Sequence, residues 1–316
     1  MFDEATDQTR GAFLDEAIRE LTLIVALQSG ARDLTRLRPR YTSRCIFCGG
    51  SPTTLEHVWP HWSHPFIKKG RKSWEAMQAT QFRDRSIWSF QQFGGDPHDW
   101  QVKCVDQACN GGWMKLQEDR FKPLFEKMLK ATDGNPVRLG PDEQTTVATW
   151  FAVKAIVQEY ARGGRSVSHY RQRQRLRTTQ KLPPRSWRIW IGNYTPGASE
   201  TMWSSFPFLL LPNATAQKRT SELARYYNSQ TASYVLGNLF ILLLRSPDEF
   251  FVTQWRHQRP VGELRQIWPL TGFSFQWPLK TMSDENAYHA VNGVRDFAEE
   301  SASKPVRVSP QGLITG

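Results

Sequence analysis

The stretch Cys45-Ile-Phe-Cys48-Gly-Gly decides the fold class, because it holds two of the four cysteines of this 316-residue chain. Two residues between the thiols let both sulfurs bind one metal ion, and the glycines permit the tight turn that follows. Cys104 and Cys109 form a second pair, with four residues between them. Since the two close pairs use every cysteine, the pattern predicts a structural zinc site of four thiolates, with no open position for catalysis. The alternative is a set of four buried free thiols.

A histidine motif lies between the two cysteine pairs and reads Glu56-His57-Val-Trp-Pro60. Asn110 directly follows the last cysteine, in the run Cys109-Asn110-Gly-Gly-Trp-Met. This order of motifs resembles the HNH, or His-Me finger, endonucleases, and most closely a bacterial and phage branch with a CN-x-GWM signature. The resemblance covers residues 45–114. It implies a zinc-bound ββα-metal module that cuts nucleic acid.

The resemblance also implies a role for each matching residue. His57 is expected to be the general base, since an imidazole can take a proton from water near neutral pH. Glu56 and Asn110 match the positions whose oxygens hold one catalytic cation, and such hard ligands suit Mg²⁺ or Mn²⁺. That cation is expected to stabilise charge on the phosphate and on the departing 3′ oxygen. Asn110 also fits the N-cap of a helix.

One element of the HNH pattern is missing from this chain. Many members carry a middle Asn that orients the catalytic histidine, but residues 45–109 contain no Asn. Asp99, Gln101 or a backbone group could take its place. The sequence leaves this choice open.

The basic character of the chain predicts a polyanionic partner. The formal net charge is +11, which favours binding to nucleic acid, and double-stranded DNA is the expected substrate. Two basic stretches are candidate contacts: Lys68, Lys69, Arg71 and Lys72 in the nuclease module, and Arg171, Arg173, Arg175 and Arg177 further along. Alternating arginines spread around a helix, so phosphate contact is expected rather than base reading. The alternative is a solvated helix face.

The apolar periodicity divides the chain into four parts. Residues 1–40 form an N-terminal helix (12–29) and a basic linker, 41–132 the HNH module with its zinc knuckles, 133–300 a C-terminal α+β domain, and 301–316 a flexible tail. Helices are predicted near 113–121, from Pro123 onward, at 141–161 and at 171–177. Strands are predicted at 187–191, 208–211 and 234–244. The fold class is therefore α+β, a ββα-metal module followed by a mixed helical and antiparallel-sheet domain.

No apolar run approaches the ~18–20 residues that span a bilayer. Asp3 and Glu4 at the start are unlike a secretory signal, so a cytoplasmic location is expected. The expected function is phosphodiester hydrolysis that nicks or cuts double-stranded DNA. Two alternatives stay open: a zinc-stabilised nucleic-acid-binding protein without catalysis, and an RNA-cleaving toxin or defence nuclease, since nothing in the site tests for a 2′-OH.

Overall fold

An antiparallel sheet of five strands organises the fold, in the order β10-β6-β9-β8-β7. The strands are β6 (Trp187–Asn193), β7 (Ser204–Phe208), β8 (Ser229–Leu236), β9 (Leu239–Arg245) and β10 (Arg265–Trp268). The computed structural model describes residues 42, 44–51, 54–67, 73–82, 85–94, 97–161, 167–180, 183, 186–195, 204–208, 229–258, 262–303, 307–308 and 314–315. Helices and antiparallel sheets together confirm the predicted α+β class.

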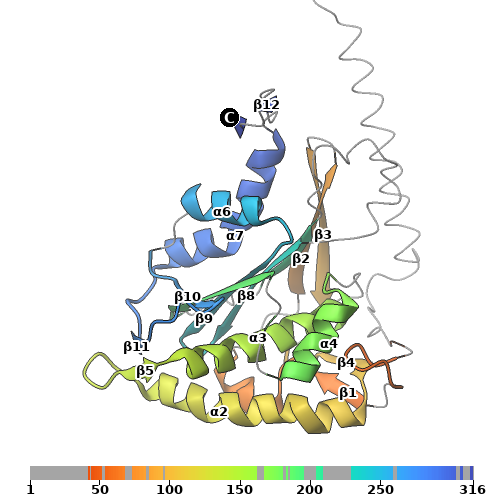
Figure 1. Ribbon diagram of the computed structural model, residues 1–316, viewed down its shortest axis with the longest axis vertical. Coiled ribbons are helices and arrows are strands. Elements are labelled where there is room, and N and C mark those ends of the chain that lie inside the picture. Colours follow the sequence, from red (N-terminus) through yellow and green to blue (C-terminus); the bar gives the residue numbers. More distant parts are fainter. Residues whose placement is uncertain are drawn as a thin grey trace, which may run out of the picture. The chain divides into compact units, whose positions relative to one another are not determined.

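Helices cover both faces of this sheet (Figure 1). On one face, Ile189 and Ile191 of β6 belong to the same apolar cluster as Trp150 of α3 (Pro141–Ala161). On the other face, Trp190 packs edge-on against Trp255 of α6 (Glu249–Gln258), in a cluster that also includes α7 (Asp284–Ser303). Because neighbouring strand residues point to opposite faces, β6 contributes to both clusters.

The helix α3 joins the sheet to the cysteine-bearing region. It matches the predicted helix over 141–161 and is apolar on nearly every side, which is typical of a buried helix. Trp150 stacks on Phe121 of α2 (Lys115–Lys130) with ring centroids 4.3 Å apart. Residues on both sides of the predicted boundary between 132 and 133 therefore share one core, within a single unit formed by Pro39–Gly316.

A proline lies inside α2 (Lys115–Lys130), where the sequence predicted a break. The prediction that Pro123 begins a second helix is wrong. Phe121, Phe125 and Met128 are all fully buried on one face of α2. A break at Pro123 would separate these side chains and expose their apolar area to water. Their burial therefore offsets the backbone hydrogen bond that the proline cannot donate.

The predicted apolar strand at 234–244 is a tight hairpin of β8 and β9. Gly237 lies between the two strands with φ +60°, a conformation that favours glycine. A Cβ at this position would lie 2.5 Å from Leu129 Cδ2 on α2, so a side chain here would require Leu129 to shift. The predicted strand at 187–191 is confirmed within β6, whereas 208–211 overlaps β7 only at Phe208, and its last three residues lie outside the described residues.

Two short strands and a helix carry the predicted site. β1 (Thr54–His57) pairs antiparallel with β4 (Gln101–Val105), and the chain then enters a wide helical turn, η3 (Cys109–Met114), which leads into α2. The 3-10 helices η1 (His61–Phe66) and η2 (Pro97–Asp99) flank this pair.

The remaining elements are peripheral pairs of strands and one helix. β2 (Ser73–Phe82) pairs with β3 (Arg85–Gly94), β5 (Val137–Leu139) with β11 (Phe275–Trp277), and β12 (Arg307–Val308) with β13 (Ile314–Thr315). The predicted basic helix is α4 (Tyr170–Thr179). The predicted segment 1–40 lies outside the described residues. In the described part of the chain, every helix is too short or too polar to cross a bilayer.

Candidate metal centre and catalytic pocket

Four side chains bring their ligand atoms within 4.8 Å of one another at the first cysteine pair: Cys45, Cys48, Asp106 and Cys109. Three thiols and one carboxylate are a donor set that suits zinc. Two residues separate Asp106 from Cys109, which repeats the Cys45-x2-Cys48 spacing. The cluster can therefore hold a metal ion such as zinc.

Cys104, the predicted fourth ligand, is not a member of this cluster. Its side chain is fully buried on β4, and its carbonyl oxygen accepts the N–H of Ile46 at 2.9 Å. Burial raises the pKa of the Cys104 thiol far above its usual range, as it also does for Cys109 within the cluster. Among the described residues, the grouping therefore joins three of the four predicted cysteines to the Asp106 carboxylate and leaves Cys104 outside it.

Two hydrogen bonds join the Asp106 carboxylate to the cysteines of the cluster. The Cys48 Sγ–H donates to Asp106 Oδ2 at 2.6 Å, and the Cys109 N–H donates to Asp106 Oδ1 at 2.7 Å. Burial raises the pKa of Cys48, and its bond to Asp106 raises it further. Burial also tends to raise the pKa of Asp106, but the bonds from Cys48 and Cys109 outweigh this and lower it. A bound metal ion would displace the thiol protons.

The helix α4 supports the turn that carries Cys45 and Cys48. Arg173 is buried on α4; its Nε–H donates to the Ile46 carbonyl at 2.8 Å and an Nη1–H donates to the Ser168 carbonyl. Gly49, which follows Cys48, has φ +83° and lies beside Tyr170 Oη. The turn after the first cysteine pair therefore packs against the same helix. We therefore withdraw Arg173 from the predicted nucleic-acid contacts, because its guanidinium is bound to the protein itself.

Of the other predicted basic contacts, three are exposed and four lie outside the described residues. Arg171, Arg175 and Arg177 are exposed on α4, as a helix with arginines spread around it requires. The predicted contacts Lys68, Lys69, Arg71 and Lys72 lie outside the described residues.

His57 and Glu56 are neighbours on β1 and point to different sides, as strand geometry dictates. His57 is half-buried and lies opposite Gln101 in the β1–β4 register. Nε2 of Gln101 is 2.5 Å from Nε2 of His57, so Gln101, one of the three groups left open by the sequence, contacts the histidine ring. Burial lowers the pKa of His57, and the adjacent His61 ring lowers it further.

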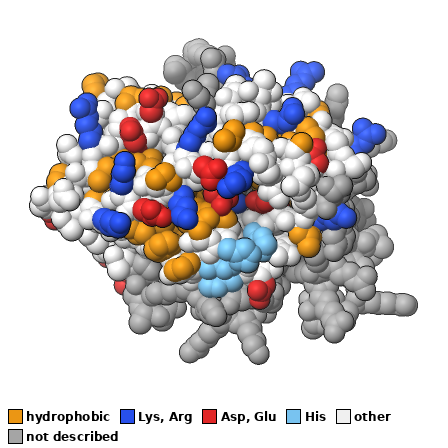
Figure 2. Space-filling model, turned by 90° about the horizontal axis from the view of Figure 1, so that it is seen from below, with side chains coloured by type: hydrophobic (Ala, Val, Ile, Leu, Met, Phe, Trp, Pro, Cys, Tyr) orange, Lys and Arg blue, Asp and Glu red, His pale blue; other side chains and the backbone are white. Residues whose placement is uncertain are grey.

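A row of four imidazoles extends from His57 across the surface, seen as one pale blue patch in Figure 2. The ring centroids of His57 and His61 are 4.3 Å apart, those of His61 and His64 are 5.0 Å apart, and His98 stacks on His64 at 4.3 Å. The i, i+3 spacing in η1 places His61 and His64 on one side.

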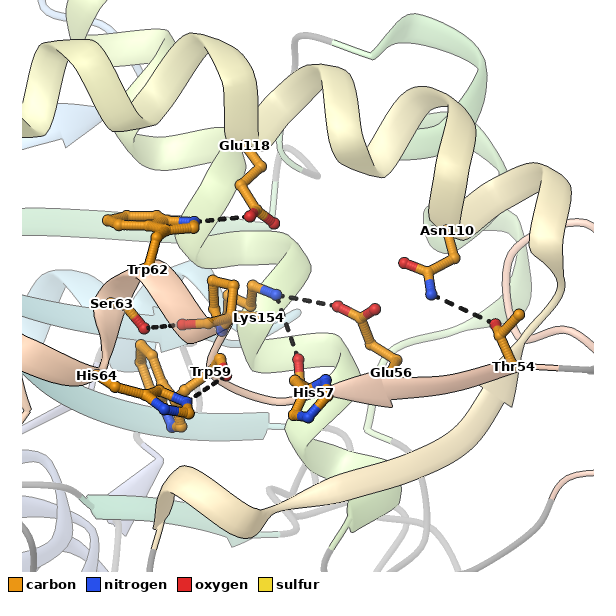
Figure 3. Close-up of polar contacts among 11 residues, drawn as sticks. Thr54, Glu56, His57, Trp59, Trp62, Ser63, His64, Asn110, Glu118 and Lys154 are labelled. Atoms are coloured by element: carbon orange, nitrogen blue, oxygen red, sulfur yellow. Dashed lines mark hydrogen bonds and ion pairs between the residues drawn. The ribbon is translucent and has the colours of Figure 1, made fainter.

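Glu56 is buried and forms an ion pair with Lys154 of α3. The Lys154 Nζ lies 3.0 Å from Glu56 Oε1 and donates to the His57 carbonyl at 3.4 Å (Figure 3). The side chains of Lys154 and Glu56 are 4% and 10% exposed, so little water screens the pair. Helix α3 thus fixes the predicted metal-binding carboxylate from outside residues 41–132.

A cavity of about 200 Å³ lies beside Glu56 and Asn110, and both side chains line it. The Asn110 Nδ2–H donates to Thr54 Oγ1 at 3.3 Å. Asn110 sits within η3, whose N-cap is Ala108, so it does not cap a helix as the alternative expected. His57 is not among the described residues that line the cavity. The structure therefore brings Glu56 and Asn110 to one space and turns His57 toward Gln101.

Two residues of this region were missed in the sequence, although each left a signal. Cys104 was paired with Cys109 in place of Asp106, although the two residues between Asp106 and Cys109 match the spacing of the first cysteine pair. Lys154 is the one charge in the apolar run 150–157, and a lone charge in a buried helix needs a partner.

Comparisons with known proteins found no relative of this chain. No family model, curated protein or solved structure matches the chain.

Proposed function

We propose that this chain is an HNH-type endonuclease that hydrolyses phosphodiester bonds in double-stranded DNA. The observation that carries the proposal is the joint placement of Glu56 and Asn110 at one cavity, with His57 beside Glu56 on the same strand. The ββα-metal module would comprise β1, β4 and the helix that begins at η3. The exposed arginines of α4 and the net charge of +11 supply the attraction to a phosphate backbone.

His57 would act as the general base. Its lowered pKa keeps the imidazole neutral near pH 7, the state that can accept a proton from water. Rotation of the Gln101 amide by about 180° would let its oxygen accept the Nε2–H of His57. The lone pair of Nδ1 would then be available for the proton of the attacking water.

Glu56 and Asn110 would hold a divalent cation, because their oxygens are the hard ligands that Mg²⁺ and Mn²⁺ prefer. When bound, such a cation would stabilise negative charge on the phosphate and on the departing 3′ oxygen. Lys154 would hold the Glu56 carboxylate in place. The metal cluster, with zinc as the proposed ion, would serve a structural role, since its four ligands leave no open position.

A plasmid-nicking assay tests this proposal. Wild-type protein is expected to convert supercoiled plasmid to open-circular or linear forms with Mg²⁺ or Mn²⁺ and not with EDTA. His57→Ala is expected to lose at least about a hundredfold in rate, the lower range for a general base. His289→Ala, at an exposed position of α7, is the matched control. Equal cleavage by wild type and His57→Ala would refute the catalytic assignment.

A nucleic-acid-binding protein without catalysis is the second candidate. The Lys154–Glu56 ion pair favours it, because an ammonium group already neutralises the carboxylate that a cation would need. This candidate predicts DNA binding without cleavage under any divalent ion. A labelled RNA of the same sequence, run beside the DNA, tests the RNA-cleaving alternative.

A further inference from the structure

Two carboxylates line the cavity together with Asn110, although the sequence pointed only to Glu56 and Asn110. Glu118 of α2 joins Glu56 and Asn110 on its walls. In Figure 3 the Glu118 carboxylate extends from α2 toward the space that Glu56 and Asn110 also face. The three side chains come from β1, η3 and α2, so the fold converges on this space from separate elements.

Each of these side chains has one polar atom engaged by a neighbour and keeps one oxygen for the cavity. The engaged atoms are Glu56 Oε1 with Lys154 Nζ at 3.0 Å, Asn110 Nδ2 with Thr54 Oγ1 at 3.3 Å, and Glu118 Oε1 with Trp62 Nε1 at 2.6 Å. Such bonds fix the orientation of a ligand before the metal ion arrives. The oxygens that remain are Glu56 Oε2, Asn110 Oδ1 and Glu118 Oε2.

A buried amide gives independent support for a ligand in this cavity. Gln117 is 3% exposed and also lines the cavity. Its Nε2 has no hydrogen-bond partner within the described part of the chain. A buried N–H without an acceptor is unfavourable, because it has lost its bond to water. A cation-bound water or a phosphate oxygen in the cavity would supply that acceptor.

The charges around the cavity leave room for a cation. Glu56 and Glu118 contribute two negative charges, and Lys154 neutralises one of them. Lys115 also lines the cavity, but its Nζ is 3.1 Å from Asp119, which takes up its charge. One negative charge remains, so a divalent cation would make the cavity net positive and suited to a phosphate.

We infer that Glu118 is a third oxygen ligand of the divalent cation, together with Glu56 and Asn110. This inference rests on the proposed nuclease site and extends it by a residue of α2. Glu118 lies four residues beyond Met114, outside the motif region 45–114.

Binding of Mn²⁺ to the full chain, first loaded with zinc, tests the inference by calorimetry and electron paramagnetic resonance. Glu118→Gln keeps an oxygen for the Trp62 N–H and removes the charge. It is expected to weaken Mn²⁺ binding by at least about tenfold. Glu126→Gln, an exposed change on the same helix, is expected to bind Mn²⁺ as wild type does. Equal Kd values for wild type and Glu118→Gln, or no Mn²⁺ binding by wild type, would overturn the inference.

The plasmid assay separates this inference from the proposed function. Mn²⁺ binding that depends on Glu118, in a protein that cuts no nucleic acid, would support the cation site and refute the nuclease. Cleavage that depends on His57, with Mn²⁺ affinity unchanged in Glu118→Gln, would support the nuclease and refute the third ligand. A thermal melt of Glu118→Gln within a few degrees of wild type ensures that lost binding is not lost folding.

Discussion

Lys154 and Glu56 form a buried ion pair, so the loss of either residue is expected to cost more stability than the loss of one partner of a surface pair. Removing two charges from water is costly, and the attraction between them offsets that cost only while both are present. Glu56 then has its place on β1 determined by a residue 98 positions away in the chain.

Lys154→Met is expected to destabilise the protein by about 3–5 kcal/mol, because Glu56 would remain as a buried, unpaired charge. Urea unfolding measures this loss. Lys127→Met, an exposed change on α2, is the control and should change stability by less than about 0.5 kcal/mol. The double variant Lys154→Met/Glu56→Met is expected to recover most of the loss. A double variant no more stable than Lys154→Met would argue against the ion pair as the cause.

The corrected metal cluster gives a second prediction at single residues. Elemental analysis of purified wild type is expected to find about one zinc per chain. Cys104→Ser should retain it, because Cys104 is outside the cluster, whereas Asp106→Ala should lose it. Asp106→Cys should also retain zinc, since a thiolate replaces the carboxylate. Loss of zinc in Cys104→Ser together with retention in Asp106→Ala would restore the four-cysteine site.

Single residues also set the limit of what the sequence could predict. The motif spacing placed Glu56 and Asn110 correctly beside one space, because β1, β4 and η3 are local to it. Lys154 and Glu118 could not be assigned, since their contacts with β1 and η1 arise from the packing of α3 and α2. The partner of His57 was left open among three groups, and a strand register decided it.

At the scale of elements, α4 has a buried side that packs against the protein and an exposed side that carries arginines. Arg173 and Leu176 are buried and attach the helix to the protein, while Arg171, Arg175 and Arg177 are exposed. The alternation of arginine and glutamine predicted that arginines spread around the helix. It could not predict which arginine faces inward, because that depends on the carbonyl of Ile46 in a distant turn.

Arg173→Met is expected to loosen α4 from the cysteine turn and to destabilise the protein by about 1.5–3 kcal/mol, the range for hydrogen bonds to a charged group. Its zinc should also be released at a lower chelator concentration than in wild type. Arg175→Met is the control, since that side chain is exposed on the same helix. Chelator curves measure both variants, and identical curves for Arg173→Met and wild type would contradict the supporting role.

The elements themselves were predictable where the apolar pattern is long. The helix α3 and the strand β6 follow their predicted ranges closely. The two departures, at Pro123 and within 234–244, have different causes. Phe121 and Phe125 pack from one face of α2 and keep it continuous through the proline. In 234–244 the Gly237-Asn238 pair is a local turn signal, which the long apolar pattern obscured.

For the molecule as a whole, the net charge of +11 predicts binding to DNA that weakens steeply as salt increases. A triple change of Arg171, Arg175 and Arg177 to Gln should lower the slope of log K against log salt by up to about 3. The matched triple change at the exposed Lys122, Lys127 and Lys130 of α2 should lower it less. Fluorescence anisotropy between low and physiological salt gives both slopes. Equal slopes for the two triple variants would remove α4 from the binding surface.

The ion pair between β1 and α3 has a consequence for how this protein can be divided or inherited. A gene fragment that encodes residues 41–132 carries every recognisable motif, yet it leaves behind the lysine that neutralises Glu56 and the arginine that closes the cysteine turn. We expect such a fragment to be less stable alone than within the whole chain, because Glu56 would be left without its partner. The motif-bearing segment and the helices that follow it therefore form one unit of stability.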